Sequence, residues 1–199
     1  PLVGGGEGYR YPEEPGSRTA AELAAAIVQD PACWQAGPDL APLARDLVEV
    51  CHRAGAKLLV NDRVDVALAA NADGVHLAGH SLPPAEARQL LGPRKLLGAS
   101  AHNLAEARAA RDGGCDFATF SPVYATPSKA QYGPPVGLDA LRDAARQLAP
   151  FPLVALGGVD LETAPACRDA GAVGAAVIRA VFAADDPTAA ASDLAAVFS

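Results

Sequence analysis

Short apolar runs alternate with longer amphipathic stretches along most of this chain. Six of these runs predict β-strands, and they lie at residues 57–61, 74–77, 95–100, 117–120, 152–157 and 174–178. Each run is apolar almost throughout instead of alternating between apolar and polar positions. Such runs are typical of parallel strands whose two faces are both covered by other parts of the protein.

The stretches between the runs have the periodicity and the end signals of α-helices. One helix opens at Pro83-Pro84, because proline suits the first helical turn. Asn103 caps another helix that runs to Asp112, with Glu106 at the third helical position. Further helices are expected at 64–70, at 138–148, after residue 161 and at 187–198.

Six strand–helix units in succession predict an α/β protein with a parallel sheet, either open and doubly wound or closed as a (β/α)8 barrel. No GxGxxG motif opens a first helix, which disfavours the dinucleotide-binding fold, so we expect the barrel. Its first two units must come from residues 1–54, where helices are predicted at 21–29 and 40–54 and a short strand at 32–35. Glycine and proline make residues 1–18 an irregular or flexible segment of a single domain that spans 1–199.

Composition and charge exclude several classes of partner. Half of the residues are hydrophobic and only 5% are aromatic, so the core must rest on Ala, Leu and Val. The net charge of −7 argues against nucleic acid, although a locally positive pocket can still bind a small anion. No apolar run is long enough to cross a membrane. The four cysteines are scattered without a CxxC pair, which disfavours a zinc site. Reduced thiols in a cytoplasmic protein are the better interpretation.

The carboxyl ends of the strands face the active site in such barrels, so the residues that follow each strand carry the candidate chemistry. Asn61 and Asp62 follow the first of the six strands, where the Asp62 carboxylate could hold Mg²⁺. Both residues are equally suited to cap the next helix, so the two interpretations stay open. His76 lies inside an apolar strand and is expected to be a hydrogen-bonded core residue, whereas Ser100 is expected to contact a ligand.

The loop after the fourth of these strands holds Thr126, Ser128 and Lys129 among prolines. Two hydroxyl donors and a cation predict phosphate binding, and the alternative is an ordinary loop with one exposed lysine. Gly157-Gly158 would let a ligand approach the backbone closely, or would form a tight turn. Ile178-Arg179 presents amides at a helix start, where barrels often hold a phosphate group.

Six motifs, in order along the chain, resemble those of thiamine phosphate synthases and of the related thiazole tautomerases. They are Asn61-Asp62-Arg63-Val64-Asp65, Asp73-Gly74-Val75-His76-Leu77, Gly98-Ala99-Ser100-Ala101-His102, Pro122 to Lys129, Ala155-Leu156-Gly157-Gly158-Val159 and Gly174-Ala175-Ala176-Val177. Each motif alone is weak. The ordered set covers roughly residues 40–185 and is highly specific.

The resemblance implies a (β/α)8 barrel that joins 4-amino-5-hydroxymethyl-2-methylpyrimidine diphosphate to a thiazole phosphate and releases pyrophosphate. In that family Mg²⁺ and cationic donors stabilise the departing pyrophosphate, and related barrels often form homodimers. Carried over by position, the resemblance assigns Asp62 to Mg²⁺, Asn61, Gln35, Ser100 and Lys129 to the pyrimidine diphosphate, and Thr126, Ser128, Gly157, Gly158, Ile178 and Arg179 to the thiazole phosphate.

The chain departs from the family pattern at three places. Residues 78–81 read Ala-Gly-His-Ser where the family has Gly-Gln-Glu-Asp, so a second Mg²⁺ carboxylate is missing at Ser81. The family's Arg and Lys are absent near Gln35, and Arg179 replaces a common Ser. The tautomerases have their catalytic histidine where this chain has Pro122, which favours the synthase. The alternatives are a tautomerase that uses another histidine and a barrel that binds thiazole phosphate without catalysis.

Overall fold

The computed structural model describes residues 25–28, 40–126 and 134–199. Several predictions lie outside the described residues. They are the irregular segment at 1–18, the strand at 32–35 and the site residues Gln35, Ser128 and Lys129.

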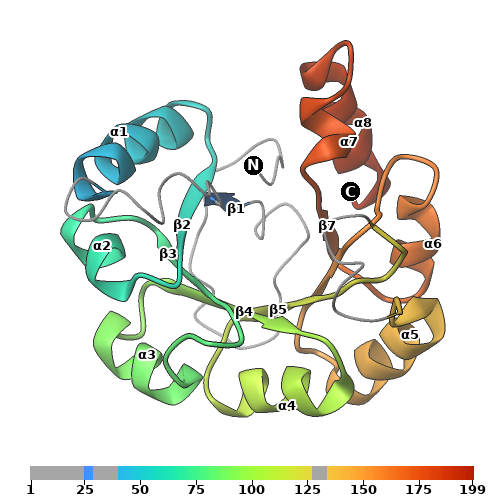
Figure 1. The fold of residues 1–199 in the computed structure, drawn as a ribbon, viewed down its shortest axis with the longest axis horizontal. Coiled ribbons are helices and arrows are strands. Elements are labelled where there is room, and N and C mark those ends of the chain that lie inside the picture. The colour runs from blue at the N-terminus through green and yellow to red at the C-terminus, as the bar shows by residue number, and fades with distance from the viewer. Residues whose placement is uncertain (1–24, 29–39, 127–133) are drawn as a thin grey trace.

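Seven parallel strands form one sheet, in the same order in space as in the sequence. They are β1 (Ala25–Val28), β2 (Lys57–Asn61), β3 (Gly74–Leu77), β4 (Leu96–Ala101), β5 (Phe117–Phe120), β6 (Leu153–Leu156) and β7 (Gly174–Ala176). Figure 1 shows the strands on the inside of an incomplete ring, with the helices around them. The six predicted strands are confirmed as β2 to β7. Within the described residues β7 does not pair with β1, so the parallel α/β ring is confirmed and its closure stays a prediction.

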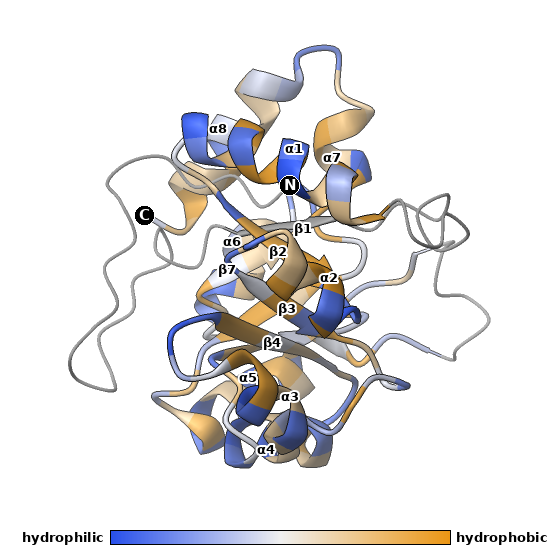
Figure 2. Cartoon of the chain, turned by 90° about the vertical axis from the view of Figure 1, so that its left-hand side faces the viewer, coloured by the Kyte–Doolittle hydropathy of each residue, from blue (hydrophilic) through white to orange (hydrophobic). Residues whose placement is uncertain are grey.

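Eight helices are present in the described residues. They are α1 (Leu40–Arg53), α2 (Val64–Ala69), α3 (Pro84–Leu91), α4 (Leu104–Asp112), α5 (Gly137–Leu148), α6 (Ala164–Asp169), α7 (Arg179–Phe182) and α8 (Pro187–Val197). Figure 2 shows strongly hydrophobic strands inside and hydrophilic stretches on the surrounding helices. No described helix combines the length and the apolar character that a membrane span requires.

The predicted cap of α4 is confirmed. Asn103 Oδ1 accepts a hydrogen bond from the Glu106 N–H at 2.9 Å, and Glu106 Oε2 accepts one from the His102 N–H at 2.8 Å. The first bond satisfies one of the amides that a helix start leaves without a partner, and the second ties Glu106 to the residue before the cap. They fix where α4 begins and hence where the loop after β4 ends.

One predicted helix is wrong. Ala25–Val28 was expected within a helix at 21–29, yet it forms β1 and pairs in parallel with β2, with Ile27 level with Leu59. Alanine favours helices, but a short apolar run that ends in two β-branched residues also suits a buried strand. Pairing with the edge of β2 favours the strand over the helix, and the local sequence does not show that this partner is available.

The core has two layers, one on each face of the sheet. The outer layer joins the strands to the helices and includes Leu58, Leu97 and Leu141. The inner layer lies inside the ring and consists of Leu59, Leu96, Phe117, Val154 and Ala176, one residue from each of five strands. Because strand side chains alternate between faces, the residues two positions beyond the inner layer also face the inside of the ring.

Two aspartates fasten the amino ends of the strands. Asp73 precedes β3 and accepts a hydrogen bond from the Leu58 N–H of β2 at 2.8 Å. Asp116 precedes β5 and accepts hydrogen bonds from the Leu97 N–H of β4 at 2.8 Å and from Arg88 Nη2 at 2.9 Å. These bonds hold neighbouring strands in register at the amino-terminal end of the ring. Residues at this end of such folds contribute to stability, and the active site is expected at the opposite end.

Candidate active site

The inward positions become polar toward the carboxyl ends of the strands. Asn61 of β2 is level with His76 of β3, and Ser100 of β4 is level with Thr119 of β5. His76 Nε2 lies 3.0 Å from Ser100 Oγ and 3.4 Å from Thr119 Oγ1. The parallel register thus brings the predicted site residues Asn61 and Ser100 to the same end of the ring, above the apolar inner layer.

Asp62 follows β2 in a turn that is held by β3. Its φ is +65°, a conformation that residues other than glycine rarely adopt, and its N–H donates to the His76 carbonyl oxygen at 2.9 Å. Arg63 is the N-cap of α2, and no side chain caps that helix. The capping interpretation of Asn61 and Asp62 is therefore wrong. The Asp62 carboxylate instead faces the loop after β3, with Oδ2 3.8 Å from His80 Nε2.

Ser81 stands at the position where the family pattern has a second Mg²⁺ carboxylate, which this chain lacks. Its Oγ accepts a hydrogen bond from the Ala78 N–H at 2.8 Å, so the hydroxyl closes the turn after β3. Within the described part of the chain, no group of three or more His, Cys, Asp or Glu side chains is placed to hold a metal ion. A cation beside Asp62 would need oxygen ligands from water or substrate as well.

Gly157 and Gly158 form the turn after β6 with φ values of +94° and +66°. A Cβ atom on Gly157 would lie 2.6 Å from Pro122 Cβ, and one on Gly158 would lie 2.7 Å from Tyr124 Cβ. The Tyr124 N–H also donates to the Gly157 carbonyl oxygen at 2.9 Å. The loop after β5 therefore makes the close approach that these glycines permit, and their contact with a phosphate stays a prediction.

The loops after β5 and β7 meet through two predicted substrate-binding residues. Arg179 Nη2 donates a hydrogen bond to Thr126 Oγ1 at 3.3 Å. Ile178 immediately precedes α7 and has an exposed side chain. The departure from the family pattern at Arg179 thus places a cation beside the loop that was expected to bind phosphate.

His76 is the residue whose importance the sequence least revealed. The prediction of a hydrogen-bonded core residue is confirmed, since only 1% of His76 is exposed, and this burial lowers the pKa of its imidazole to about 4. Its hydrogen-bond partner is Ser100, however, so it belongs to the candidate site. The only signal in the sequence was a polar residue near the end of an otherwise apolar strand.

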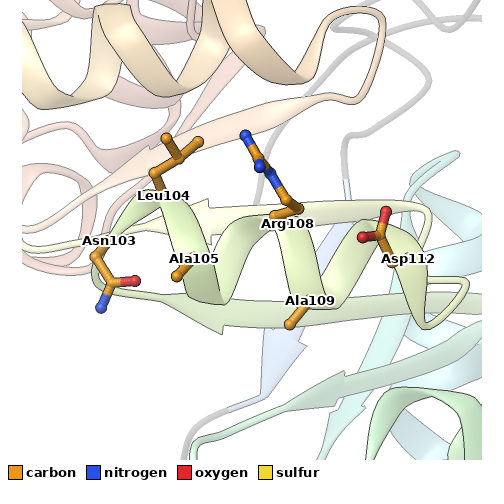
Figure 3. Close-up of a pocket in the computed structure, with 6 residues that line it drawn as sticks. All are labelled: Asn103, Leu104, Ala105, Arg108, Ala109 and Asp112. Carbon is orange, nitrogen blue, oxygen red and sulfur yellow. The ribbon is translucent and has the colours of Figure 1, made fainter.

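A separate hollow on the outside of the ring does not carry the candidate chemistry (Figure 3). Its lining residues are Asn103, Leu104, Ala105, Arg108, Ala109 and Asp112, all along α4. The polar ends of two of them are already engaged, Asn103 with Glu106 and Arg108 Nη2 with Gln147 Oε1 at 3.2 Å. The carboxyl end of the sheet remains the candidate active site.

Comparison with known proteins shows the family to which the chain belongs. A family model described as thiamine monophosphate synthase matches residues 17–181. The chain belongs to the thiamine monophosphate synthase family. Among members of this family, the thiamine-phosphate synthase of Chloroflexus aurantiacus is 51% identical over 156 residues, which are 78% of this chain and 71% of the relative. The thiamine-phosphate synthase of Chlorobium luteolum is 45% identical over 163 residues, which are 82% of this chain and 76% of the relative.

Solved structures place the same family on the same fold. The thiamine phosphate pyrophosphorylase from Pyrococcus furiosus has a TM-score of 0.72 at 30% identity, and the match covers 86% of this chain and 80% of that one. A 3-hexulose-6-phosphate synthase has a TM-score of 0.65 at 23% identity, which shows a shared fold alone. The resemblance to thiamine phosphate synthases that six motifs indicated is therefore confirmed.

Proposed function

We propose that this chain is a thiamine phosphate synthase, which joins 4-amino-5-hydroxymethyl-2-methylpyrimidine diphosphate to thiazole phosphate and releases pyrophosphate. The observation that carries the proposal is the polar set Asn61, His76, Ser100 and Thr119, which lies at the carboxyl end of the sheet in a chain of this family. Two relatives that the chain matches over most of its length have the name thiamine-phosphate synthase. We expect the reaction at the end of the ring where Asn61, Asp62 and Ser100 lie.

The side chains of this site suit charge stabilisation better than covalent catalysis. In the proposed reaction the bond between the pyrimidine methylene carbon and the diphosphate oxygen breaks, and its electron pair leaves with pyrophosphate. The thiazole nitrogen then supplies the electron pair of the new carbon–nitrogen bond. Ser100 and Lys129 would donate to the departing diphosphate, while Thr126 and Arg179 would hold the thiazole phosphate. One preorganised donor of this kind contributes about 2–4 kcal/mol to transition-state stabilisation.

The remaining predicted contacts complete this arrangement. Asn61 and Gln35 would meet the pyrimidine diphosphate, and the hydroxyl of Ser128 would join Thr126 at the thiazole phosphate. Gly157, Gly158 and the backbone at Ile178 would present amides to the same phosphate group. Each of these roles is a proposal that rests on position in the family motifs.

Asp62 is the residue proposed to hold Mg²⁺. Magnesium is commonly bound through one or two carboxylates together with substrate phosphates and water. Asp62 has a partly exposed carboxylate beside the polar set, which suits this pattern. When bound there, the ion would neutralise charge that develops on the leaving pyrophosphate.

Three broader features are also proposed. The ring is expected to close as a (β/α)8 barrel, in keeping with the parallel order of its seven described strands. The cytoplasm is the expected location, supported by the free thiols of Cys51, Cys115 and Cys167. A homodimer is expected from the family resemblance, and sedimentation at the mass of two chains would test it.

The role of Asp62 can be tested against a matched carboxylate. Asp62→Asn keeps the size of the side chain and removes its charge, so we expect kcat/KM for thiamine phosphate formation to fall about 100-fold. Asp65→Asn makes the same change at an exposed carboxylate that pairs with Arg63 at 2.6 Å, and we expect less than a twofold effect. Equal losses in the two variants would contradict the assignment of Asp62.

One observation favours a second candidate function. Because the Ser81 hydroxyl closes a turn where the family has a Mg²⁺ carboxylate, the chain is also suited to bind thiazole phosphate without turnover. Calorimetry with thiazole phosphate separates the candidates: binding together with product formation supports the synthase, and binding alone supports the second function. The tautomerase alternative gains no support, since Pro122 is buried against Gly157 at the position of that enzyme's histidine.

A further inference from the structure

The buried side chain of His76 lies next to the hydroxyl of Ser100, which is proposed to bind substrate. His76 is 1% exposed, and its ring centroid lies 5.9 Å from that of Phe117, which belongs to the apolar inner layer. On its other side, His76 Nε2 lies 3.0 Å from Ser100 Oγ. A Cβ atom on Gly98 would come within 2.7 Å of His76 Nδ1, so the glycine leaves the space that the imidazole fills.

The two ring nitrogens of His76 have different surroundings. Nε2 has hydroxyl neighbours, whereas Nδ1 is buried and has no hydrogen-bond partner in the described part of the protein. A proton on Nδ1 would be a buried donor without an acceptor, which native proteins very rarely tolerate. A bare Nδ1 lone pair is better tolerated. The neutral tautomer with its proton on Nε2 is therefore favoured, and burial disfavours the charged ring.

This tautomer determines how Ser100 uses its own hydroxyl group. Nε2–H must donate, so Ser100 Oγ accepts, and the Ser100 proton cannot point back toward the ring. Ser100 is only partly buried, and it lies at the carboxyl end of β4. Its proton is left to donate toward the open end of the ring, where an anionic group would accept it. Thr119 Oγ1 is the weaker neighbour of Nε2, at 3.4 Å.

We infer that His76 is a positioning residue, which holds Ser100 so that its hydroxyl donates to the phosphate groups of the substrate. The inference rests on the proposed function in one respect, because Ser100 must meet substrate. His76 itself touches no substrate and exchanges no proton during the reaction. Its neutral form acts as a fixed donor, and the effect of removing it must pass through Ser100.

The tautomer can be measured without any activity. Imidazole ¹⁵N spectra of the whole chain, assigned with the His76→Gln variant, are expected to show a protonated Nε2 and a bare Nδ1 on His76. This pattern should stay unchanged between pH 8 and pH 5.5. A protonated Nδ1, or titration of His76 in this range, would overturn the inference and leave the proposed function standing.

Kinetics test whether the effect passes through Ser100. We expect His76→Leu to lower kcat/KM about three- to tenfold in the wild-type background, the range expected for one hydrogen bond, and to have no further effect in Ser100→Ala. His76→Gln, which keeps an N–H donor, should recover part of the loss. Equal losses from His76→Leu with and without Ser100 would contradict a positioning role. Unfolding midpoints of all the variants identify any loss that is due to misfolding, and the ¹⁵N measurement decides the tautomer in that case.

Discussion

At the scale of single residues, the polar groups of the site are held in place by apolar or backbone neighbours. The Phe117 ring lies beside the His76 ring, and the turn at Asp62 is tied to β3 by its N–H bond to the His76 carbonyl oxygen. Asp62 adopts a positive φ, which costs free energy that the rest of the fold must offset. Such a cost is common at functional sites, where a side chain must point in a particular direction.

Burial of His76 makes the stability of the protein depend on pH. The pKa of the folded imidazole is about 4, below its ordinary value of about 6.5, so the folded state binds fewer protons than the unfolded state. Its contribution to stability is complete above pH 6.5 and is lost as the pH falls toward 4. We expect the free energy of unfolding in urea to be about 2 kcal/mol lower at pH 5.0 than at pH 7.5 from this residue alone. His76→Gln should reduce the difference by that amount, and an unchanged difference would show that the ring is not buried in its neutral form.

Arg179 offers a second test at the residue scale, because it departs from the family pattern. Its guanidinium contacts Thr126, and the proposed role of Arg179 is to bind the phosphate of the thiazole substrate. We expect Arg179→Ala to raise the KM for thiazole phosphate about tenfold with a smaller change in kcat. Arg168→Ala removes an exposed arginine that pairs with Asp169 on α6, and its KM should stay at the wild-type value. A similar KM in both variants would show that Arg179 does not bind this substrate.

At the scale of elements, β2 to β7 could be predicted because their apolar runs are continuous and lie between clear helix signals. β1 could not, because Ala25–Val28 suits a helix or a strand equally well, and only the edge of β2 decides. The sequence also indicated which strand ends carry polar residues. It did not reveal that His76 contacts Ser100 or that Arg179 contacts Thr126, since both contacts depend on strand register and loop paths.

The turn after β6 gives a prediction at this scale. Gly158 has a φ of +66°, and a Cβ atom there would lie 2.7 Å from Tyr124 Cβ and 2.9 Å from the Ala125 carbonyl oxygen. Gly55 has a φ of +69°, but a Cβ atom there would meet no atom within 4 Å, so Gly55→Ala reports backbone strain alone. We expect Gly55→Ala to lower the free energy of unfolding by about 1 kcal/mol and Gly158→Ala by about 2–4 kcal/mol. Equal losses would show that the loop after β5 yields without cost.

At the scale of the whole molecule, the residues that stabilise the ring and the polar residues of the candidate site lie at opposite ends of the strands. Asp73 and Asp116 fasten strands at the amino ends, the apolar inner layer fills the middle, and the polar set lies at the carboxyl ends. This division is the one expected of parallel barrels with active sites at the carboxyl face. It places the substrates of the proposed reaction where several strands can each supply one side chain.

Formation of thiamine phosphate from two phosphorylated precursors can be followed directly by ³¹P NMR of the reaction mixture. With the whole chain, both precursors and Mg²⁺, we expect the signals of the pyrimidine diphosphate to disappear while pyrophosphate and thiamine phosphate grow in equal amounts. Omitting either precursor should leave the spectrum unchanged. Unchanged signals in the complete mixture, or release of inorganic phosphate in place of pyrophosphate, would contradict the proposed synthase activity.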